Sequence, residues 1–312
     1  MKDDIVADLR AGVERALALG AVAVWAVVQC GLAVAQRIHG GAIGLGRLGE
    51  SPYPYVHFGP AVATQGTMVH PYLLAGLAML AASLIVWAVV THRHPIWIVL
   101  GAVAVAPVGF TYSRAGLLGF ALLGGCVGLA ALLRGGRHWL AVGALVVGAA
   151  VPALIWSNGW TQRAQQTTSG AAVNSIDTDR STLIKQALHL IKREPVLGVG
   201  PGRYVIELRD RHMAKIAGVY KPVHDLPLLV AAEGGVLAGA LMVALLGATG
   251  WQARRAGWLG LAVFLNFLPW VLLDHFPYTF PQGLAMTGVW IGALDLLARR
   301  TVAVSPPAAA PA

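Results

Sequence analysis

Charged residues are scarce in this chain of 312 residues. They make up 12% of it, about half of their usual share in a soluble domain, while 57% of the residues are hydrophobic. This balance excludes an ordinary soluble enzyme and is typical of a polytopic membrane protein. The net charge of +9 comes from 23 Lys and Arg against 14 Asp and Glu. We expect no nucleic-acid partner.

Cysteine and the familiar cofactor motifs are also rare or absent. The two cysteines, Cys30 and Cys126, lie in apolar stretches, so no disulfide framework is indicated. The segment GVGPGR lacks the third glycine of a dinucleotide fingerprint, and neither a Gly-Lys-Ser/Thr phosphate loop nor a His-Glu-x-x-His zinc pair occurs. Asp177 and Asp179 could hold a divalent cation, but their position before a predicted helix also suits a helix cap. We therefore expect no cofactor and no metal.

Long apolar runs are what the chain has in abundance. At about 1.5 Å per residue, a run of about 20 residues crosses a hydrocarbon layer of about 30 Å, and only helices satisfy their own backbone there. The sequence thus predicts an all-α membrane protein with eight transmembrane helices. These are residues 16–35, 68–90, 95–112, 115–133, 139–156, 226–247, 257–273 and 282–298.

The distribution of Lys and Arg predicts the orientation, because positive residues are retained on the cytoplasmic side. With both termini inside, the cytoplasmic segments hold ten Lys and Arg and the short outer loops hold three. Residues 1–15 are then a cytoplasmic leader, 16–156 a five-span part, 226–298 a three-span part, and 299–312 a disordered tail. Residues 157–225 form one long loop outside the membrane.

This long loop is the most informative region, since loops of such length are often functional. It carries ten Lys and Arg against six Asp and Glu. Residues 180–194 predict an amphipathic helix that begins after Asp179 and ends before Pro195. Its apolar face would comprise Leu183, Ile184, Ala187, Leu188 and Ile191. A second, basic helix is predicted from Tyr204 to Ala217.

Five polar residues on or near the outer side are candidates for a site. Arg114 follows Tyr112-Ser113 in a tight turn, Arg180 starts the loop helix, and His224 precedes the sixth span. Each also has a structural explanation: a snorkelling arginine, a surface charge and a helix-start histidine. Glu233 lies inside the sixth span, where a carboxylate is costly unless it is paired or lines a wet cavity. Asp274 lies in the outer turn LLDHFPYTFPQ and could equally be a plain interfacial residue.

Four segments in sequence order resemble the successive signatures of the O-antigen ligase/polymerase family. They are GTMVHPYLLAGLAML (66–80), TYSRAGLLG (111–119), RSTLIKQALHLIKREPVLGVGPGRY (180–204) and VHDLPLLVAAEGGVLAG (223–239). In that family the last block reads His-Asn, nine residues, then Gly-x-x-Gly. This chain has His224-Asp225, nine residues, Gly235, and Ala238 in place of the final glycine. It also has fewer predicted spans before the long loop than members of the family usually have.

The resemblance implies a metal-independent, inverting glycosyltransferase of the bacterial cytoplasmic membrane. Its donor would be a glycan on undecaprenyl diphosphate, and its acceptor a hydroxyl of lipid A core, another glycan or a protein, with membrane lipids around it. Arg114 and Arg180 would bind the diphosphate, and His224 would deprotonate the acceptor. Glu233 and Asp274 would position His224 or the acceptor. Asp274, together with Arg203 and Asp225 of these motifs, is assigned to substrate binding.

Two other functions stay open at this point. A polymerase that extends lipid-linked repeat units would use the same chemistry with another acceptor. A transporter or flippase for lipid-linked glycans would need polar residues along a path between the spans. Within the predicted spans the only charged residues are Glu233 and Asp295.

Overall fold

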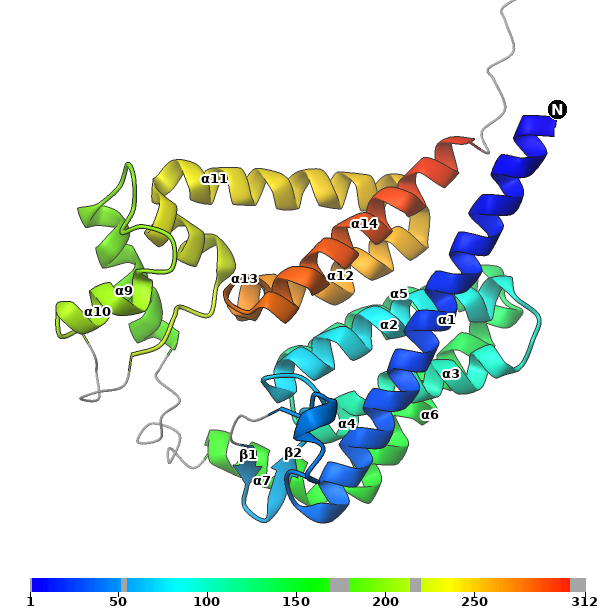
Figure 1. The fold of residues 1–312 in the computed structure, drawn as a ribbon, viewed down its shortest axis with the longest axis horizontal. Helices are drawn as coiled ribbons and strands as arrows, with labels where there is room; N and C mark the ends of the chain where they lie inside the picture. The colour runs from blue at the N-terminus through cyan, green and yellow to red at the C-terminus, as the bar shows by residue number, and fades with distance from the viewer. Residues whose placement is uncertain (1, 52–54, 169–179, 214–219, 304–312) are drawn as a thin grey trace, which may run out of the picture. The chain divides into compact units, whose positions relative to one another are not determined.

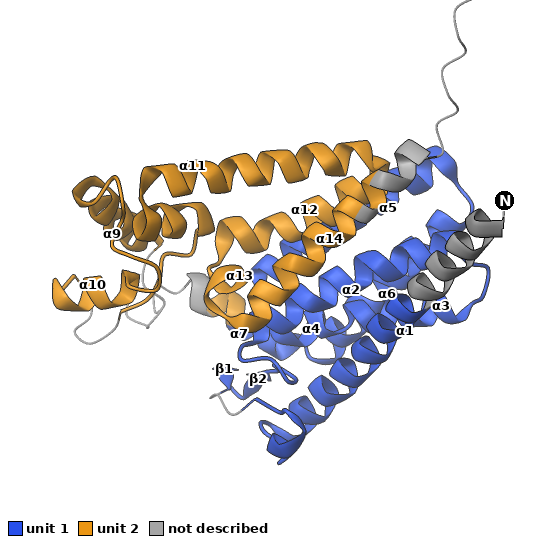
Figure 2. Cartoon of the chain, turned by 45° about the horizontal axis from the view of Figure 1, so that its top comes forward, with its two compact units in different colours: residues 1–162 blue, residues 163–312 orange. Residues whose placement is uncertain are grey.

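The chain folds into two compact helical units. The structure, a computed structural model, describes residues 2–51, 55–168, 180–213 and 220–303 (Figure 1). Unit 1 comprises residues 1–162 and unit 2 comprises residues 163–312 (Figure 2). The boundary lies within α7 (Ser157–Thr168), a polar helix in the long loop that the sequence did not predict.

Each of the eight predicted spans coincides with one helix or, at 95–112, with two. The helices are α1 (Lys2–His39), α2 (Pro71–Thr91), α3 (Ile96–Val105) with α4 (Pro107–Thr111), α5 (Arg114–Arg134), α6 (Arg137–Ile155), α11 (Leu226–Arg255), α12 (Gly257–Leu273) and α14 (Pro281–Ala303). Among the described residues, five helices are long and apolar enough to cross a membrane: α1 from Leu17 onward, α2, α5, α6 and α11. The α3–α4 segment and α12 are apolar but shorter. The protein is therefore a helical membrane protein, while the total of eight spans stays a prediction.

Unit 1 is built around α2, which is buried along most of its length. It contacts α1, α3, α4, α5 and α6. The connection from α1 to α2 contains a short 3-10 helix (Gly46–Leu48) and an antiparallel hairpin of β1 (Val56–Phe58) and β2 (Ala61–Ala63). Buried Glu50 holds this connection together by accepting hydrogen bonds from Gln36 Nε2, the amides of Ile43 and Leu45, and Tyr55 Oη. The predicted leader, residues 1–15, continues directly into the first span because α1 begins at Lys2.

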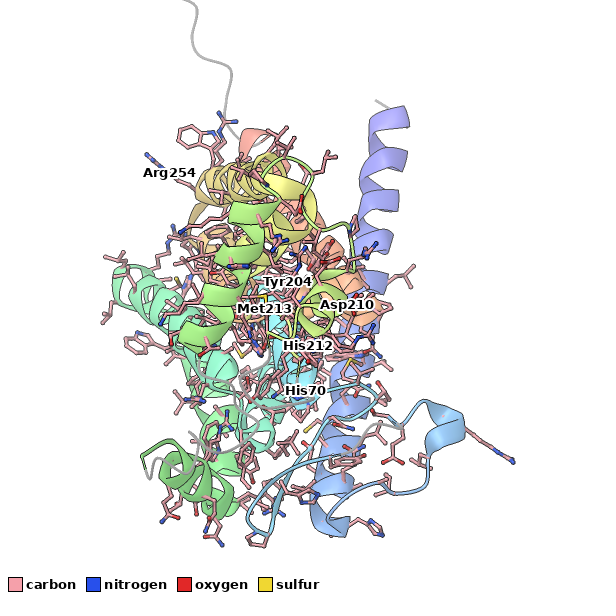
Figure 3. All side chains as sticks on the ribbon, turned by 90° about the vertical axis from the view of Figure 1, so that its left-hand side faces the viewer. His70, Tyr204, Asp210, His212, Met213 and Arg254 are labelled. Atoms are coloured by element: carbon pink, nitrogen blue, oxygen red, sulfur yellow. The ribbon has the colours of Figure 1, made fainter. Side chains whose placement is uncertain are left out.

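In unit 2, α11, α12 and α14 pack alongside one another, and α9 (Arg180–Arg193) lies against the beginning of α11 (Figure 1). The small α10 (Tyr204–Asp210) completes this part, and α13 (Phe276–Thr279) links α12 to α14. Figure 3 shows Tyr204 close to Met213, and both pack in the apolar cluster between α9, α10 and α11. Arg254 points outward at the far end of α11 (Figure 3).

The two predicted loop helices exist, but their details differ from the prediction. Leu183 and Ala187 of α9 are buried, whereas Ile184 and Leu188 are 39% and 42% exposed, so the buried face is narrower than predicted. The second helix, α10, ends at Asp210 and not at Ala217. Its end is set by His212, whose φ of 53° is left-handed and incompatible with a continuing helix.

Helix α11 is broken at Gly235, ten positions into the span. The φ of Gly235 is 82° and its ψ is 173°, a conformation open to glycine alone. A break of this kind leaves backbone groups without their helical partners, which an apolar surrounding makes costly.

The loop between α9 and α10 (residues 194–203, hereafter the α9–α10 loop) supplies the missing partners. The Val236 amide donates to the Pro195 carbonyl oxygen at 2.8 Å. The Val199 amide donates to the Ala232 carbonyl oxygen, and the Gly200 amide to the Glu233 carbonyl oxygen, both at 2.9 Å. The α9–α10 loop therefore completes the hydrogen bonding of α11 across its break.

Replacing Gly235 by alanine should destabilise unit 2. The new Cβ would overlap the Val196 carbonyl oxygen, and the left-handed φ alone costs an alanine about 1–2 kcal/mol. We expect a lower apparent Tm for Gly235→Ala in detergent. Gly247→Ala in the same helix is the control, because its Cβ meets nothing within 4 Å. An unchanged Tm for Gly235→Ala would contradict this account of the break.

Candidate functional site

The candidate site lies at the end of unit 2 where α11 begins and α12 ends. These two helices pack against each other. His224 lies just before the first turn of α11, and Asp274 directly follows the last residue of α12. Since both residues come from the same end of the helix pair, the fold brings them together although 50 positions separate them in the sequence.

The position of His224 in the chain is fixed by the beginning of α11. The next residue, Asp225, is the N-cap of α11, and its Oδ1 accepts a hydrogen bond from the Leu228 amide at 2.9 Å. An N-cap of this type typically contributes about 1 kcal/mol to a helix. Asp225 therefore has a structural task, and the substrate contact predicted for it stays a prediction. His224 itself is half-buried.

The turn that follows α12 supplies a carboxyl group and a second imidazole. Asp274 and His275 are 2% and 8% exposed. Asp274 Oδ1 accepts from the amides of His275 at 2.8 Å and Phe276 at 3.4 Å, which closes the turn around the carboxyl group. The side chains of His224, Asp274 and His275 each place one nitrogen or oxygen atom within 4.8 Å of the others. The two imidazole rings meet edge to face, with centroids 4.9 Å apart.

Arg180 reaches the same turn from the first residue of α9. Its Nη2 donates to the Leu273 carbonyl oxygen at 2.9 Å, and its charge acts on the Asp274 carboxyl. Arg180 is otherwise exposed, so part of its guanidinium group remains open to other partners. The structure thus brings together three of the predicted site residues, Arg180, His224 and Asp274.

Asp274 has an unusual acidity for an aspartate. Burial raises the pKa of its carboxyl to about 7, while the amides of His275 and Phe276 and the positive charge of Arg180 act in the opposite direction. The carboxyl group therefore changes its charge near neutral pH, beside the two imidazoles of His224 and His275.

Two imidazoles and a carboxylate are also a set that transition metals accept. One ligand atom from each of His224, Asp274 and His275 lies within 4.8 Å of the others. Arg180 adds a positive charge next to Asp274, which opposes a cation. The other predicted candidates for a cation, Asp177 and Asp179, lie outside the described residues.

Glu233 organises the α9–α10 loop. Its carboxylate, 5% exposed, accepts from the amide of Gly202 at 2.9 Å, the amide of Tyr204 at 3.3 Å and the hydroxyl of Tyr278 at 3.1 Å. Burial and the negative charge of Glu233 raise the pKa of Tyr204 and Tyr278. This carboxylate therefore links α10, α11 and α13, which explains how a charged residue is accommodated inside a predicted span.

The remaining predicted arginines differ in their surroundings. Arg203 is exposed and pairs with Glu207 at 3.2 Å, an arrangement that contributes little on a solvated surface. Arg114 belongs to unit 1, where it is the exposed first residue of α5. Before it, Ser113 caps the helix by accepting from the Gly116 amide at 3.0 Å, and Tyr112 is buried with a left-handed φ of 51°. This local geometry turns the chain sharply and leaves the guanidinium group of Arg114 at the surface.

His275, Tyr278 and Thr279 were not identified from the sequence. The turn DHFPYTFP is the one polar interruption between the seventh and eighth predicted spans, and it lies next to the candidate Asp274. That neighbourhood was a usable signal for His275. The contact of Tyr278 with Glu233, 45 positions away, had no sequence signal.

Replacing Glu233 by glutamine should destabilise unit 2. The amide NH2 of glutamine would face a backbone or hydroxyl donor where a carboxylate oxygen now accepts. One buried donor would then lose its acceptor, which should lower the free energy of unfolding by about 1–3 kcal/mol. Glu207→Gln, which removes only ion pairs with Arg203 and Arg211, is the control, with an expected loss below about 1 kcal/mol. Thermal unfolding in detergent compares the two variants. Equal losses would refute the bridging role of Glu233.

Replacing Asp274 by asparagine should change how stability depends on pH. Between about pH 4 and the folded pKa of about 7, the folded carboxyl binds a proton that the unfolded chain has released. Wild-type stability should therefore fall as pH rises through this window, with the full loss present above it. Asp274→Asn lacks this loss, so its apparent Tm relative to wild type should be higher at about pH 8 than at about pH 5. Asp210→Asn, at an exposed carboxylate, is the control. An offset that is the same at both pH values would exclude the raised pKa.

The comparisons with known proteins bear on the same region. Neither the curated proteins nor the solved structures give a match to the chain. Residues 105–243 match the family model described as O-antigen ligase. This stretch runs from the end of α3 into α11 and contains Arg114, Arg180, Arg203, His224 and Glu233. Asp274 and His275 follow it. This match supports membership of the O-antigen ligase/polymerase family.

Proposed function

We propose that this protein is a metal-independent, inverting glycosyltransferase that moves a glycan from undecaprenyl diphosphate to an acceptor hydroxyl. Membership of the O-antigen ligase family supports a ligase-like or polymerase-like activity on a lipid-linked glycan. The observation that carries the proposal is that Arg180 and His224 meet at one turn, Leu273–His275, at the end of α12. A guanidinium group and an imidazole at the same turn support the proposal of an anion-binding group beside a base.

In this proposal His224 acts as the general base. It takes the proton of the acceptor hydroxyl while the hydroxyl oxygen attacks the anomeric carbon of the donor sugar. The bond from that carbon to the diphosphate breaks, and the electron pair leaves with the diphosphate. Attack from the face opposite the leaving group inverts the anomeric centre. Asp274, beside His224, favours the protonated imidazole whenever its own carboxyl is ionised.

Arg180 binds the donor diphosphate. A guanidinium group presents paired N–H donors that match phosphate oxygens, and it offsets the negative charge that grows on the leaving group. The bond to the Leu273 carbonyl oxygen uses one donor and orients the rest of the group. The diphosphate linkage itself supplies the driving force, so the proposal needs neither a nucleotide nor a metal.

Arg114 is proposed as a second ligand of the diphosphate. The support is its motif TYSRAGLLG within the matched domain and the exposure of its side chain at the start of α5. Glu233 is proposed to act by holding the α9–α10 loop in place, as its three hydrogen bonds to Gly202, Tyr204 and Tyr278 support.

The proposed location is the bacterial cytoplasmic membrane, with both termini in the cytoplasm and residues 157–225 outside. The acceptor would be lipid A core, another glycan or a protein. The apolar helices and the family support an integral membrane protein that acts on lipid-linked glycans.

Alanine at His224, Arg180 or Arg114 should abolish glycan transfer in cells that lack the natural gene. Loss of a general base lowers rates by about 10²–10⁴-fold, so surface glycan should disappear and carrier-linked glycan should accumulate on the outer face. His189→Ala and Arg209→Ala, at exposed positions of α9 and α10, are the matched controls. The measurements are the amounts of surface glycan and of carrier-linked glycan on each face of the membrane.

Each outcome of this experiment is informative. Full transfer by one variant removes that residue from the mechanism. Carrier-linked glycan that stays on the inner face would replace the transferase by a flippase. Unextended repeat units on the carrier, with normal attachment of whatever chains exist, would indicate a polymerase. Loss of transfer by the purified protein in EDTA would overturn metal independence.

A further inference from the structure

His275 is a second imidazole beside the proposed base, and the proposed mechanism does not use it. Its side chain is 8% exposed, and its ring meets that of His224 at an interplanar angle of 83°, with centroids 4.9 Å apart. It also contacts the rings of Phe276 and Phe280, at 4.6 and 6.4 Å between centroids. The ring therefore has two aromatic neighbours besides His224.

Hydrogen bonds with Thr279 set the orientation of the His275 ring. Thr279 Oγ1 lies 2.7 Å from His275 Nδ1 and 3.2 Å from the His275 carbonyl oxygen. The hydroxyl group therefore ties the imidazole to the first turn of its own short helix, α13.

A ring held in place can restrict the imidazole beside it. The edge-to-face contact with the buried His275 limits the orientations open to the His224 ring. His224, Asp274 and His275 each place one nitrogen or oxygen atom within 4.8 Å of the others, and the Asp274 carboxyl accepts from the His275 amide, which holds the turn that carries His275. Asp274, when ionised, favours the protonated form of His224.

We propose that His275 is the positioning residue of the transfer reaction, holding the imidazole of His224 in the orientation in which it takes the acceptor proton. This inference rests on the proposed function and deepens it. No atom of His275 enters the bond changes: the acceptor oxygen gains the anomeric carbon, the diphosphate leaves with the electron pair, and the proton goes to His224. The contribution of His275 appears only through His224.

The test is a double-mutant cycle on the full-length protein in detergent. Carrier-linked glycan extracted from the deletion strain is the donor probe, and envelope from the same strain is the acceptor. His275→Ala should lower kcat at least about 10-fold and leave the KM for donor within about 3-fold, since misplacing a base affects the transition state more than ground-state binding. In a His224→Ala background, His275→Ala should have no further effect. His189→Ala is the control for loss of an imidazole from the surface of unit 2.

Thr279 variants keep the proposal testable if His275→Ala does not fold. Thr279→Val retains the size of the side chain but removes both hydrogen bonds of the hydroxyl, so kcat should fall. Thr279→Ser retains them, so kcat should stay near the wild-type value. A structural role alone would lower the amount of folded protein and leave kcat per folded molecule unchanged.

The outcomes separate this inference from the proposed function. Unchanged kcat in His275→Ala and Thr279→Val, with His224→Ala inactive, overturns the positioning role and leaves His224 as the base. Losses that multiply in the double variant overturn it as well, because His275 would then act independently of His224. A fully active His224→Ala overturns the proposed function itself.

Discussion

A helix that changes direction within an apolar segment must find new partners for the amides and carbonyls that it releases. In this protein the partners come from another part of the chain, the α9–α10 loop, which accepts from Val236 and donates to the carbonyl oxygens of Ala232 and Glu233. Both sides are backbone, so the exchange depends on the two chain paths running close together. Glycines at 198 and 235 permit this approach, since a Cβ at either position would overlap the opposite backbone. The long loop and the membrane helix are therefore one folding unit at this point.

The contact between the α9–α10 loop and α11 also explains why a carboxylate, Glu233, is found inside the sixth predicted span. Glu233 is at the last turn before the break, where it can accept from the amides of Gly202 and Tyr204 in the incoming chain and from the Tyr278 hydroxyl of α13. Three donors hydrogen-bond to its carboxylate, and hydrogen bonding of this kind offsets the cost of burying the negative charge. Arg180 connects α9 to the end of α12 through the Leu273 carbonyl oxygen. The turn that carries Asp274 and His275 is thus held on one side by α9, through Arg180, and on the other by α11, through Glu233 and Tyr278.

Much of this arrangement could be predicted from the sequence, because it depends on the spacing of apolar residues and on where polar residues fall relative to the spans. The apolar runs located the helices, and the resemblance in four segments pointed to the O-antigen ligase family, which the match at residues 105–243 supports. His224 and Asp274 were both predicted on the outer side, one just before the sixth span and one just after the seventh. What could not be predicted depends on tertiary contacts. In the sequence Gly235 looks like an ordinary glycine within a helix. The break becomes apparent only when the loop that hydrogen-bonds to the helix there is known. Ile184 and Leu188 were assigned to the buried face of α9 by periodicity, but α11 covers only the narrower stripe around Leu183, Ala187 and Leu190.

The loop that repairs α11 has a second side with its own chemistry. Because the carbonyl of Pro195 and the amide of Val199 face the helix, the chain between them turns its side chains elsewhere, and Val196 and Leu197 are 77% and 81% exposed. Keeping two such side chains in water forgoes about 1.5–3 kcal/mol each of hydrophobic stabilisation. The exposed side chains of Val196 and Leu197 would consequently be more stable in contact with hydrocarbon than with water. The α9–α10 loop thus has two faces: its backbone supplies the hydrogen bonds that α11 lacks, and its apolar side chains point away from that helix.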